Sequence, residues 1–304
     1  MDTLTTCDSA TTPRIGAIAP WFGGKRVMAP LIAKELGHHR QYFEPFCGSM
    51  AVLFAKDHVG HETVNDLHDD LINLARVVAD GDQAPRLYKR LQRTLFCEEL
   101  LRDAAAVLNS TRDNSPSAIP NMTRAYWYFL TAWMGRNGEA GTTKISYSAS
   151  VRWTPNGGSP TVRFQSAVDS LPWWHRRLSN VVILNRDAFE VINSAGDTAS
   201  TALYIDSPYT ADTRGTAKYL HDFESGGGMF AGADDHERLR DALERFKNAR
   251  VVVSYYDSPR VRELYAGWTF VECSRHKHLT TTAGSNGQKN APEILILNGE
   301  SWAK

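Results

Sequence analysis

Short apolar runs that end in a polar or acidic residue occur near both ends of the chain and predict the strands of a sheet. Three helices are predicted around the first two of these runs: one before them, from near Pro30 to Gly37, one between them over 51–55, and one after them over 70–78. This alternation of strands and helices is typical of a doubly wound α/β fold. The predicted strands are Tyr42–Phe46, Glu62–Asp66, Val181–Asn185, Ala202–Asp206, Arg250–Ser254 and Glu293–Asn298.

The middle of the chain has a different pattern. Helices are predicted over Arg86–Leu108 and over Tyr126–Trp133, which is rich in aromatic residues, whereas 138–160 has the Gly, Ser, Thr and Asn content of loops or short hairpins. We interpret 84–174 as an insert, mainly of helices and loops, in one α/β domain. That domain consists of 14–83 and 175–304, and 1–13 is interpreted as a flexible polar tail.

Composition narrows the class of protein. The 304 residues include 34 basic and 34 acidic side chains, so a nucleic-acid contact would need a local basic face. The four cysteines have neither paired nor metal-binding spacing, which favours free thiols in a reducing compartment such as the cytoplasm, with no metal site. Neither a membrane span nor a signal peptide is predicted.

Asp206-Ser207-Pro208-Tyr209 follows the apolar run Ala202–Ile205. A carboxylate at the carboxyl end of a strand can accept a hydrogen bond from an amine. Pro208 stiffens the next step of the backbone, and the ring of Tyr209 can stack on a flat group. A flat group with an exocyclic amine is a nucleobase, which inside duplex DNA has to be flipped out before it can react.

A glycine turn and two acids suggest a nucleoside-like ligand. Gly48 follows a predicted strand and would let a ligand approach the backbone, although a tight turn is the alternative. The missing GxGxxG motif disfavours a dinucleotide, and a ligand with a methionine tail and a ribose fits better. Asp66 has the spacing of a ribose-binding acid, or it caps a helix. Asp187 and Phe189 could hold an adenine, or they are a cap and a core residue.

Gly23-Gly24-Lys25 resembles a truncated phosphate loop. The Walker spacing GxxxxGK is absent, which excludes the triphosphate site that this motif builds. Lys25 could instead meet a carboxylate.

Together these segments resemble the alpha-group DNA adenine methyltransferases, the family of the bacterial Dam enzyme. Residues 21–25 are similar to its W-x-G-G-K motif, 43–52 to its F-x-E/D-P-F-x-G-S-G-A-V loop, and Asp206–Tyr209 to its D-P-P-Y motif. Asn65-Asp66 with 71–74 resembles its N-D…L-I-N-L segment, and the motifs follow the family's order. A phage-type branch is resembled by Thr213-Arg214 through Tyr219, Asp235-His236, Val253–Pro259 and Glu293–Leu295.

The resemblance implies a Rossmann-like class I methyltransferase, a mixed sheet with helices on both faces and an inserted target-recognition region. It implies S-adenosylmethionine as cofactor, S-adenosylhomocysteine as product, and methyl transfer to the 6-amino group of a flipped adenine in double-stranded DNA. Asp206 and the Ser207 carbonyl would accept hydrogen bonds from that amine, and Tyr209 would stack on the base, with Pro208 completing the catalytic motif. The implied cofactor-binding residues are Trp21, Gly23, Lys25, Glu44, Phe46, Gly48, Asp66, Asp187, Phe189 and Asp206.

Two residues depart from the family pattern. Ser207 replaces the first proline of D-P-P-Y, and Met50 replaces a glycine of the cofactor loop. Serine still supplies a carbonyl, but its φ is less restricted, so we expect looser geometry and reduced activity. Met50 is expected to pack where the loop becomes a helix.

The predicted DNA contacts fall in three places. Arg86, Lys89, Arg90 and Arg93 are spaced to form one basic stripe on a helix, for phosphates or merely as a solvated face. Arg136 and Asn137 suit base edges. Arg214 and Lys218 lie in the segment after Tyr209, which we expect to close over the target.

Other interpretations remain open from the sequence. The same chemistry would methylate the 4-amino group of cytosine, although Asp206 favours adenine. A catalytically weakened DNA-binding relative is a second alternative, and a nicotinamide-dependent dehydrogenase is disfavoured by the missing glycine motif. We expect a bacterial or phage-encoded protein, a monomer or weak dimer, with a cognate restriction endonuclease as a possible partner.

Overall fold

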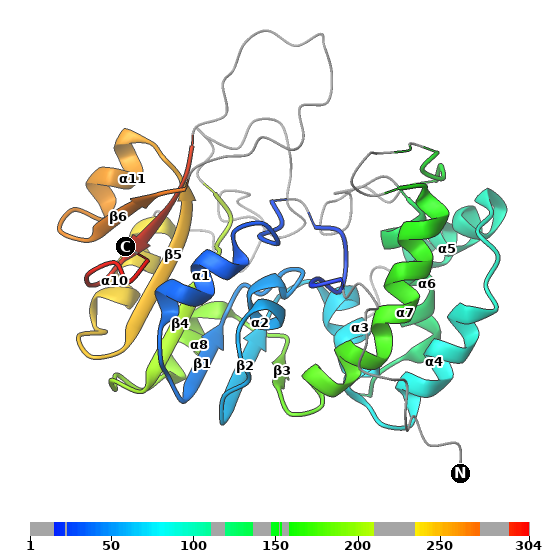
Figure 1. Cartoon of the computed structure of the whole chain (residues 1–304), viewed down its shortest axis with the longest axis horizontal. Coiled ribbons are helices and arrows are strands. Elements are labelled where there is room, and N and C mark those ends of the chain that lie inside the picture. The colour runs from blue at the N-terminus through cyan, green and yellow to red at the C-terminus, as the bar shows by residue number, and fades with distance from the viewer. Residues whose placement is uncertain are drawn as a thin grey trace, which may run out of the picture.

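Seven strands form one mixed sheet in a computed structural model that describes residues 15–21, 23–110, 119–135, 147–151, 153, 158–209, 235–273 and 292–303 (Figure 1). Their order is β3-β2-β1-β4-β5-β7-β6. The first five strands in this order, from β3 to β5, are parallel to their neighbours. β7 runs antiparallel to both β5 and β6. The strands are β1 (Gln41–Glu44), β2 (His61–Asn65), β3 (Val182–Leu184), β4 (Thr201–Ile205), β5 (Arg250–Tyr256), β6 (Thr269–Glu272) and β7 (Glu293–Leu297). The predicted α/β class with a mixed sheet is confirmed.

Helices cover both faces of this sheet and build a second layer beside it (Figure 1). The helices near the sheet are α1 (Ala29–Leu36), α2 (Ala51–Ala55), α8 (Ala188–Ser194), α10 (Asp235–Glu244) and α11 (Pro259–Leu264). The neighbouring layer consists of α3 (Asp69–Ala79), α4 (Gln83–Gln92), α5 (Glu98–Ser110), α6 (Met122–Met134) and α7 (Pro160–Leu178).

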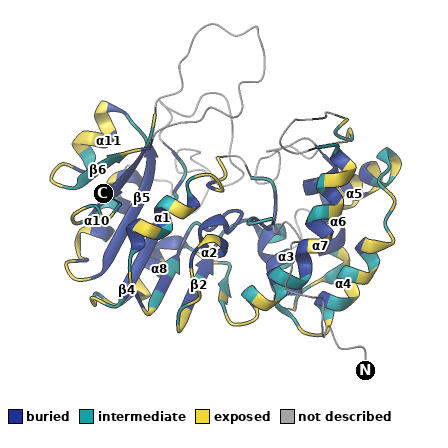
Figure 2. Ribbon diagram, viewed as in Figure 1, coloured by how far each residue is buried: buried dark blue, intermediate teal, exposed yellow. Residues whose placement is uncertain are grey.

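Two hydrophobic cores lie on opposite faces of the sheet because successive side chains of a strand alternate in direction. In β4, Ala202 and Tyr204 join the core that contains α1 and α2, whereas Leu203 and Ile205 join the core that contains α8 and α10. All five residues of β4 are therefore buried, and this strand is dark blue in Figure 2. A parallel strand covered on both faces has the continuous apolar run that the sequence shows.

The first core continues into the helical layer, so α3 to α7 and the sheet share one apolar interior. Trp174 is fully buried, and its indole nitrogen donates a hydrogen bond to the carbonyl of Ile15 at 2.8 Å. Arg177 pairs with the buried Glu62 of β2 and donates to the carbonyl of Leu53. The aromatic side chains of α6 belong to this interior or pack against it.

Four elements, including α7, differ from the sequence prediction. The single helix predicted over Arg86–Leu108 is two helices, α4 and α5. Between them the Thr94 hydroxyl donates to the carbonyl of Arg90, a local bond that competes with a regular helix. The predicted first strand stops at Glu44, before Pro45, because proline has no N–H for the ladder. β6, a short edge strand of half-exposed residues, was not predicted.

α7 begins where loops were predicted to end. Ser159 caps it by accepting a hydrogen bond from the Val162 amide, and Pro160 occupies its first turn. This Ser-Pro start is a readable signal, but Pro172 inside the helix obscures the periodicity. The helix runs to Leu178 and so crosses the expected domain boundary between 174 and 175.

Three cysteines, Cys47, Cys97 and Cys273, fall within the described residues and are free thiols. Within the same residues, no His, Cys, Asp or Glu side chains gather in a group of three or more that could hold a metal ion. None of the described helices combines the length and the apolar character needed to cross a membrane.

Candidate active site

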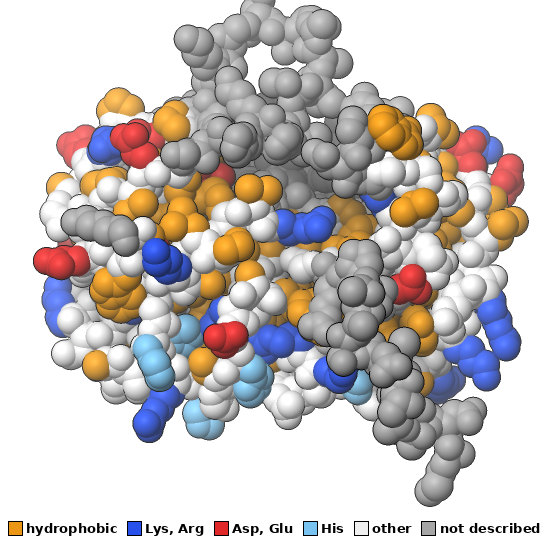
Figure 3. All heavy atoms as spheres, in the orientation of Figure 1, with side chains coloured by type: hydrophobic (Ala, Val, Ile, Leu, Met, Phe, Trp, Pro, Cys, Tyr) orange, Lys and Arg blue, Asp and Glu red, His pale blue; other side chains and the backbone are white. Residues whose placement is uncertain are grey.

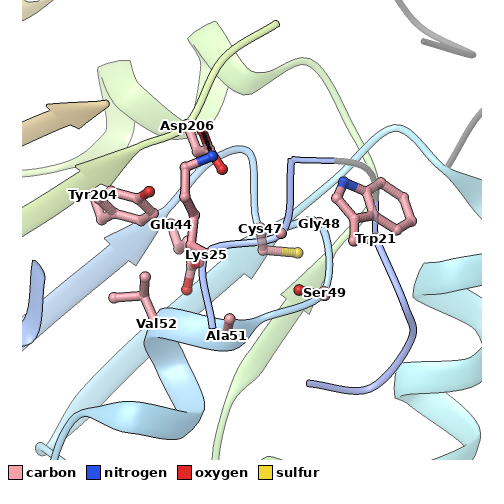
Figure 4. Close-up of a pocket in the computed structure, with 11 residues that line it drawn as sticks. Trp21, Lys25, Glu44, Cys47, Gly48, Ser49, Ala51, Val52, Tyr204 and Asp206 are labelled. Atoms are coloured by element: carbon pink, nitrogen blue, oxygen red, sulfur yellow. Dashed lines mark ion pairs between the residues drawn. The ribbon is translucent and has the colours of Figure 1, made fainter. Parts of the chain in front are cut away.

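A pocket lies at the carboxyl ends of β1 and β4, where the order in which the chain adds strands to the sheet reverses. From β1 the sheet continues through β2 to β3, and from β4 it continues through β5. Such a switch point opens a crevice outside the strand ends, which is the usual ligand site of this fold class. The pocket is lined by Trp21, Gly24, Lys25, Glu44, Cys47, Gly48, Ser49, Ala51, Val52, Tyr204 and Asp206 (Figure 4). The structure therefore brings together five predicted site residues from three separate segments.

The turn after β1 requires glycine at position 48. Gly48 has φ of 43°, and a Cβ there would lie 2.8 Å from the indole nitrogen of Trp21. Its amide donates to Oδ2 of Asp66 at 2.9 Å, and the His68 amide donates to Oδ1 of the same carboxylate at 2.9 Å. Asp66 thus holds the turn in place from the end of β2. Its role toward a ribose stays a prediction.

Met50 adopts a backbone conformation that suits glycine. Its φ is 60°, in the left-handed region, at the residue that precedes α2. The side chain is fully buried in the first core, which confirms that it packs at the loop-to-helix transition. The chain therefore combines a strained backbone with a buried apolar side chain at this point.

Lys25 reaches across the pocket to two acids. Its ammonium nitrogen lies 2.9 Å from Oδ1 of Asp206 and 3.2 Å from Oε1 of Glu293, and it donates to the carbonyl of Gly23 at 2.7 Å. Burial alone would lower the pKa of Lys25, but the two carboxylates outweigh it and hold that pKa well above its usual value. Lys25 therefore meets a carboxylate, as the sequence suggested, and the carboxylate is that of Asp206.

Asp206 sits directly after β4 and accepts two hydrogen bonds from cationic or hydroxyl donors. Besides Lys25, the Ser254 hydroxyl of β5 donates to Oδ1 at 2.8 Å. Burial raises the pKa of Asp206 above its ordinary value, and the charge of Lys25 acts against that rise. The carboxylate is thus a preorganised acceptor for N–H and O–H groups in the lining of the pocket.

Tyr209 is buried beside this acid. Its hydroxyl donates to Oε1 of Glu293 at 2.6 Å, and its ring lies edge-on to Tyr256 with centroids 4.6 Å apart. The Lys25 nitrogen lies 5.0 Å from the centroid of the same ring. The ring thus forms one wall at the acid, and stacking on a base stays a prediction.

Glu44 ends β1 at the floor of the pocket. It is almost fully buried, and its Oε2 accepts a hydrogen bond from the Tyr42 hydroxyl at 2.9 Å. Burial raises the pKa of Glu44 to about 8, although the bond from Tyr42 acts in the opposite direction. Burial therefore favours the protonated form of this carboxyl group.

The other predicted site residues do not line the pocket. Asp187 caps α8 by accepting a hydrogen bond from the Phe189 amide at 2.8 Å, and Phe189 is buried in the second core. This arrangement matches the cap-and-core alternative, and adenine binding by this pair stays a prediction. Phe46 packs against the second core, and Pro208 is half-buried.

The predicted basic stripe lies on α4, at the lower right of Figure 1, where basic side chains gather on the surface in Figure 3. Arg86, Lys89 and Arg93 are exposed, whereas the guanidinium of Arg90 stacks 3.7 Å from the centroid of Tyr126. The whole segment expected to close over the target, Thr210 to Gly232, lies outside the described residues. Four further predicted DNA contacts also lie outside them: Arg136, Asn137, Arg214 and Lys218.

Sequence reasoning gave no role to four residues that contact the D-S-P-Y motif or its neighbours. Glu293 and Ser254 bind Lys25, Tyr209 or Asp206 directly. Tyr255 accepts or donates a hydrogen bond with the Ser207 hydroxyl at 2.9 Å, and with His236 at the same distance. A polar residue inside or at the start of an apolar run, as at Ser254 and Glu293, was the available signal.

Comparison with known proteins places this site in a family. The family described as D12 class N6 adenine-specific DNA methyltransferase matches residues 21–281. The chain is also 25% identical over 289 residues to the retron Ec67 DNA adenine methylase of Escherichia coli. The aligned region covers 94% of this chain and 92% of that protein. The resemblance drawn from the motifs is thereby confirmed. Because the family match runs through both the glycine turn and the acid after β4, the chain belongs to the D12 class of N6 adenine-specific DNA methyltransferases, which methylate adenine in DNA.

Proposed function

We propose that the chain moves a methyl group from S-adenosylmethionine to the 6-amino group of an adenine flipped out of duplex DNA, at a specific sequence. The carrying observation is the carboxylate of Asp206, which is half-buried at the end of β4 and already accepts hydrogen bonds from the Lys25 ammonium and the Ser254 hydroxyl. An adenine amine offers the same kind of donor. The ring of Tyr209, which is buried beside this acid, is the flat group that we propose stacks on the base.

The pocket residues fit the proposed cofactor. The turn at Gly48 brings backbone close to the ligand space, and the carboxylate of Asp66 lies beside it for ribose hydroxyls. Trp21, Lys25 and Glu44 line the pocket and would border the methionine end of the cofactor. We keep Gly23 and Phe46 as further proposed contacts of that end, and Asp187 and Phe189 as proposed contacts of the adenine. When bound, S-adenosylmethionine supplies a sulfonium methyl group that a nitrogen lone pair can attack, and S-adenosylhomocysteine is released.

The residues of the motif would prepare the amine for this attack. The lone pair of an adenine 6-amino group is conjugated with the ring, so the amine is a poor nucleophile. Hydrogen bonds from its two protons, one to Asp206 and one to the Ser207 carbonyl, favour a tetrahedral nitrogen with a localised lone pair. Catalysis then consists of positioning and electrostatic stabilisation, with no covalent enzyme intermediate. The amine proton leaves to solvent after transfer.

We propose that the exposed residues of the α4 stripe bind phosphates. Replacing Arg86, Lys89 and Arg93 together by glutamine should weaken binding to all DNA sequences alike, and should flatten the dependence of log Kd on log salt by about 0.9 per lost contact. Arg102→Gln, at an exposed arginine of α5, is the matched control. An unchanged salt slope in the triple variant would leave the stripe as a solvated helix face. A restriction endonuclease partner, a monomeric or weakly dimeric state, and a bacterial or phage source stay predictions.

Methylation of cytosine at its 4-amino group is the competing reaction, since it uses the same acceptors. The two are separated by incubating purified protein with isotope-labelled S-adenosylmethionine and mixed-sequence DNA, followed by nucleoside analysis. The proposal predicts label in N6-methyladenine. Label in N4-methylcytosine would replace it with the competing reaction, and DNA binding without label would favour a catalytically weakened relative.

A further inference from the structure

A buried chain of hydrogen bonds leads away from the residue that departs from the family motif. Ser207 stands where the family has the first proline of D-P-P-Y, and its hydroxyl lies 2.9 Å from the Tyr255 hydroxyl. The Tyr255 hydroxyl in turn lies 2.9 Å from Nδ1 of His236. The exposed fractions of Ser207 and His236 are only 2% and 1%, and Tyr255 is fully buried. Water therefore does not compete for these bonds.

Tyr255, in the middle of these hydrogen bonds, is held firmly by its surroundings. Tyr255 belongs to β5 and pairs in register with Ile294 of β7. Its ring packs against Tyr209 and Tyr265, with centroids 5.7 and 6.0 Å away, and against the imidazole of His236. His236 lies in the first turn of α10, which packs on the same side of the sheet as α8. A hydroxyl held between a central strand and a helix can fix a third residue.

Ser207 has to be held in one conformation because of the role proposed for its carbonyl. In the mechanism above the carbonyl of Ser207 is the second acceptor for the target amine. A proline at this position would restrict φ through its ring, whereas serine leaves φ free. The bond from the Ser207 side chain to Tyr255 restricts the same residue from outside the backbone. A displacement of the acceptor by about 1 Å would be enough to slow the reaction roughly a hundredfold.

We propose that Tyr255 and His236 are positioning residues that take the place of the missing proline, by holding Ser207 so that its carbonyl faces the target amine. The inference rests on the proposed function and adds to it two residues that touch neither base nor cofactor. The direction of the bonds is consistent when Ser207 donates to Tyr255 and Tyr255 donates to Nδ1 of His236. His236→Asn keeps an acceptor near the position of Nδ1 and serves as the conservative variant.

The test is a double-mutant cycle between the tether and the proline. Tyr255→Phe in the wild-type background should lower kcat for N6-adenine methylation by roughly tenfold to a hundredfold, while the Kd for S-adenosylhomocysteine stays unchanged. In the Ser207→Pro background the ring fixes φ, so adding Tyr255→Phe should lower kcat by less than about threefold. His236→Ala should lower kcat, and His236→Asn should restore most of it. Equal losses from Tyr255→Phe in the two backgrounds would overturn the inference.

A control at the other end of β4 distinguishes a positioning role of Tyr255 and His236 from a general effect on stability. Thr201→Val removes a buried hydroxyl that pairs with Thr198 at 2.9 Å, and it should lower thermal stability without lowering kcat. Should Ser207→Pro fail to fold, Ser207→Ala replaces it: Ser207→Ala, Tyr255→Phe and their combination should then lose kcat equally, and additive losses would overturn the inference. An inactive wild type would overturn the proposed function and this inference together, whereas an active wild type with unaffected variants would overturn this inference alone.

Discussion

The ammonium nitrogen of Lys25 lies 2.9 Å from Oδ1 of Asp206, at the acceptor proposed for the target amine. Lys25 thus occupies a hydrogen-bonding position that the adenine would need, and it also supplies the charge that favours the ionised carboxylate. The two groups come from segments far apart in the sequence. Their pairing makes the protonation of Asp206 depend on Lys25.

Lys25→Met should therefore move the acidic limb of the pH profile to higher pH. Burial already raises the pKa of Asp206, and Glu293 adds to that rise while Lys25 opposes it. Without the ammonium the pKa rises further, so the carboxylate takes up a proton earlier as pH falls and loses its capacity to accept from the amine. The measurement is kcat against pH at saturating substrates. Lys34→Met, at an exposed lysine of α1, is the control, and an identical acidic limb in both variants would contradict the account.

Glu44→Gln should alter how stability depends on pH. The pKa of Glu44 is about 8 in the folded protein against 4.5 ordinarily, so between these values the folded state holds a proton that the unfolded chain has lost. The free energy of unfolding of the wild type should fall as pH rises through this window, by at most about 1.4 kcal/mol per pH unit, and level off above it. Glutamine cannot titrate, so the variant should lack this contribution.

Denaturant unfolding of wild type and Glu44→Gln at several pH values between 5 and 9 measures the effect. The stability of the variant relative to the wild type should increase with pH up to about 8. Glu263→Gln, at an exposed acid of α11, should show no such trend. A constant difference between Glu44→Gln and wild type would show that Glu44 is ionised in the folded protein.

At position 50, a glycine variant should be more stable than an alanine variant, which is the reverse of the usual order. Both substitutions remove the same buried side chain, so both should destabilise the protein by a few kcal/mol. Because φ at this residue is 60°, alanine keeps the strained backbone and glycine relieves it. Met50→Gly should therefore be more stable than Met50→Ala by about 1 kcal/mol. Equilibrium unfolding of the two variants is the measurement, and a less stable glycine variant would show that position 50 does not hold a left-handed conformation in solution.

Much of the fold was predictable because its central strands are apolar runs that end in polar residues. β4 is buried on both faces and is followed at once by Asp206, so pattern and chemistry coincide. β6 was not predictable, since a four-residue edge strand with half-exposed side chains has little pattern of its own. α7 was missed because Pro172 interrupts its periodicity, although buried residues such as Phe164 and Trp174 hold it in the core.

The site was predictable only as far as local motifs reach. Lys25, Gly48 and Asp206 each follow a recognisable turn or strand end. Glu293 and Ser254 were not assigned roles because they lie on neighbouring strands, where only the pairing of β5 with β4 and β7 brings them to Asp206. The strand order has to be known before these two residues can be placed near Asp206, and the sequence pattern alone does not give that order.

Asp206→Asn tests the central claim most directly, because it keeps the shape of the side chain and removes its charge. The account predicts that methyl transfer to adenine falls by roughly a hundredfold or more, as expected for loss of a charge-stabilising group, while the affinity for S-adenosylhomocysteine stays within a few-fold of wild type. Asp103→Asn, at an exposed acid of α5, should leave both quantities unchanged. The measurement is the rate of N6-methyladenine formation with saturating DNA and S-adenosylmethionine. A rate near that of the wild type would contradict the role of Asp206 as the acceptor of the target amine.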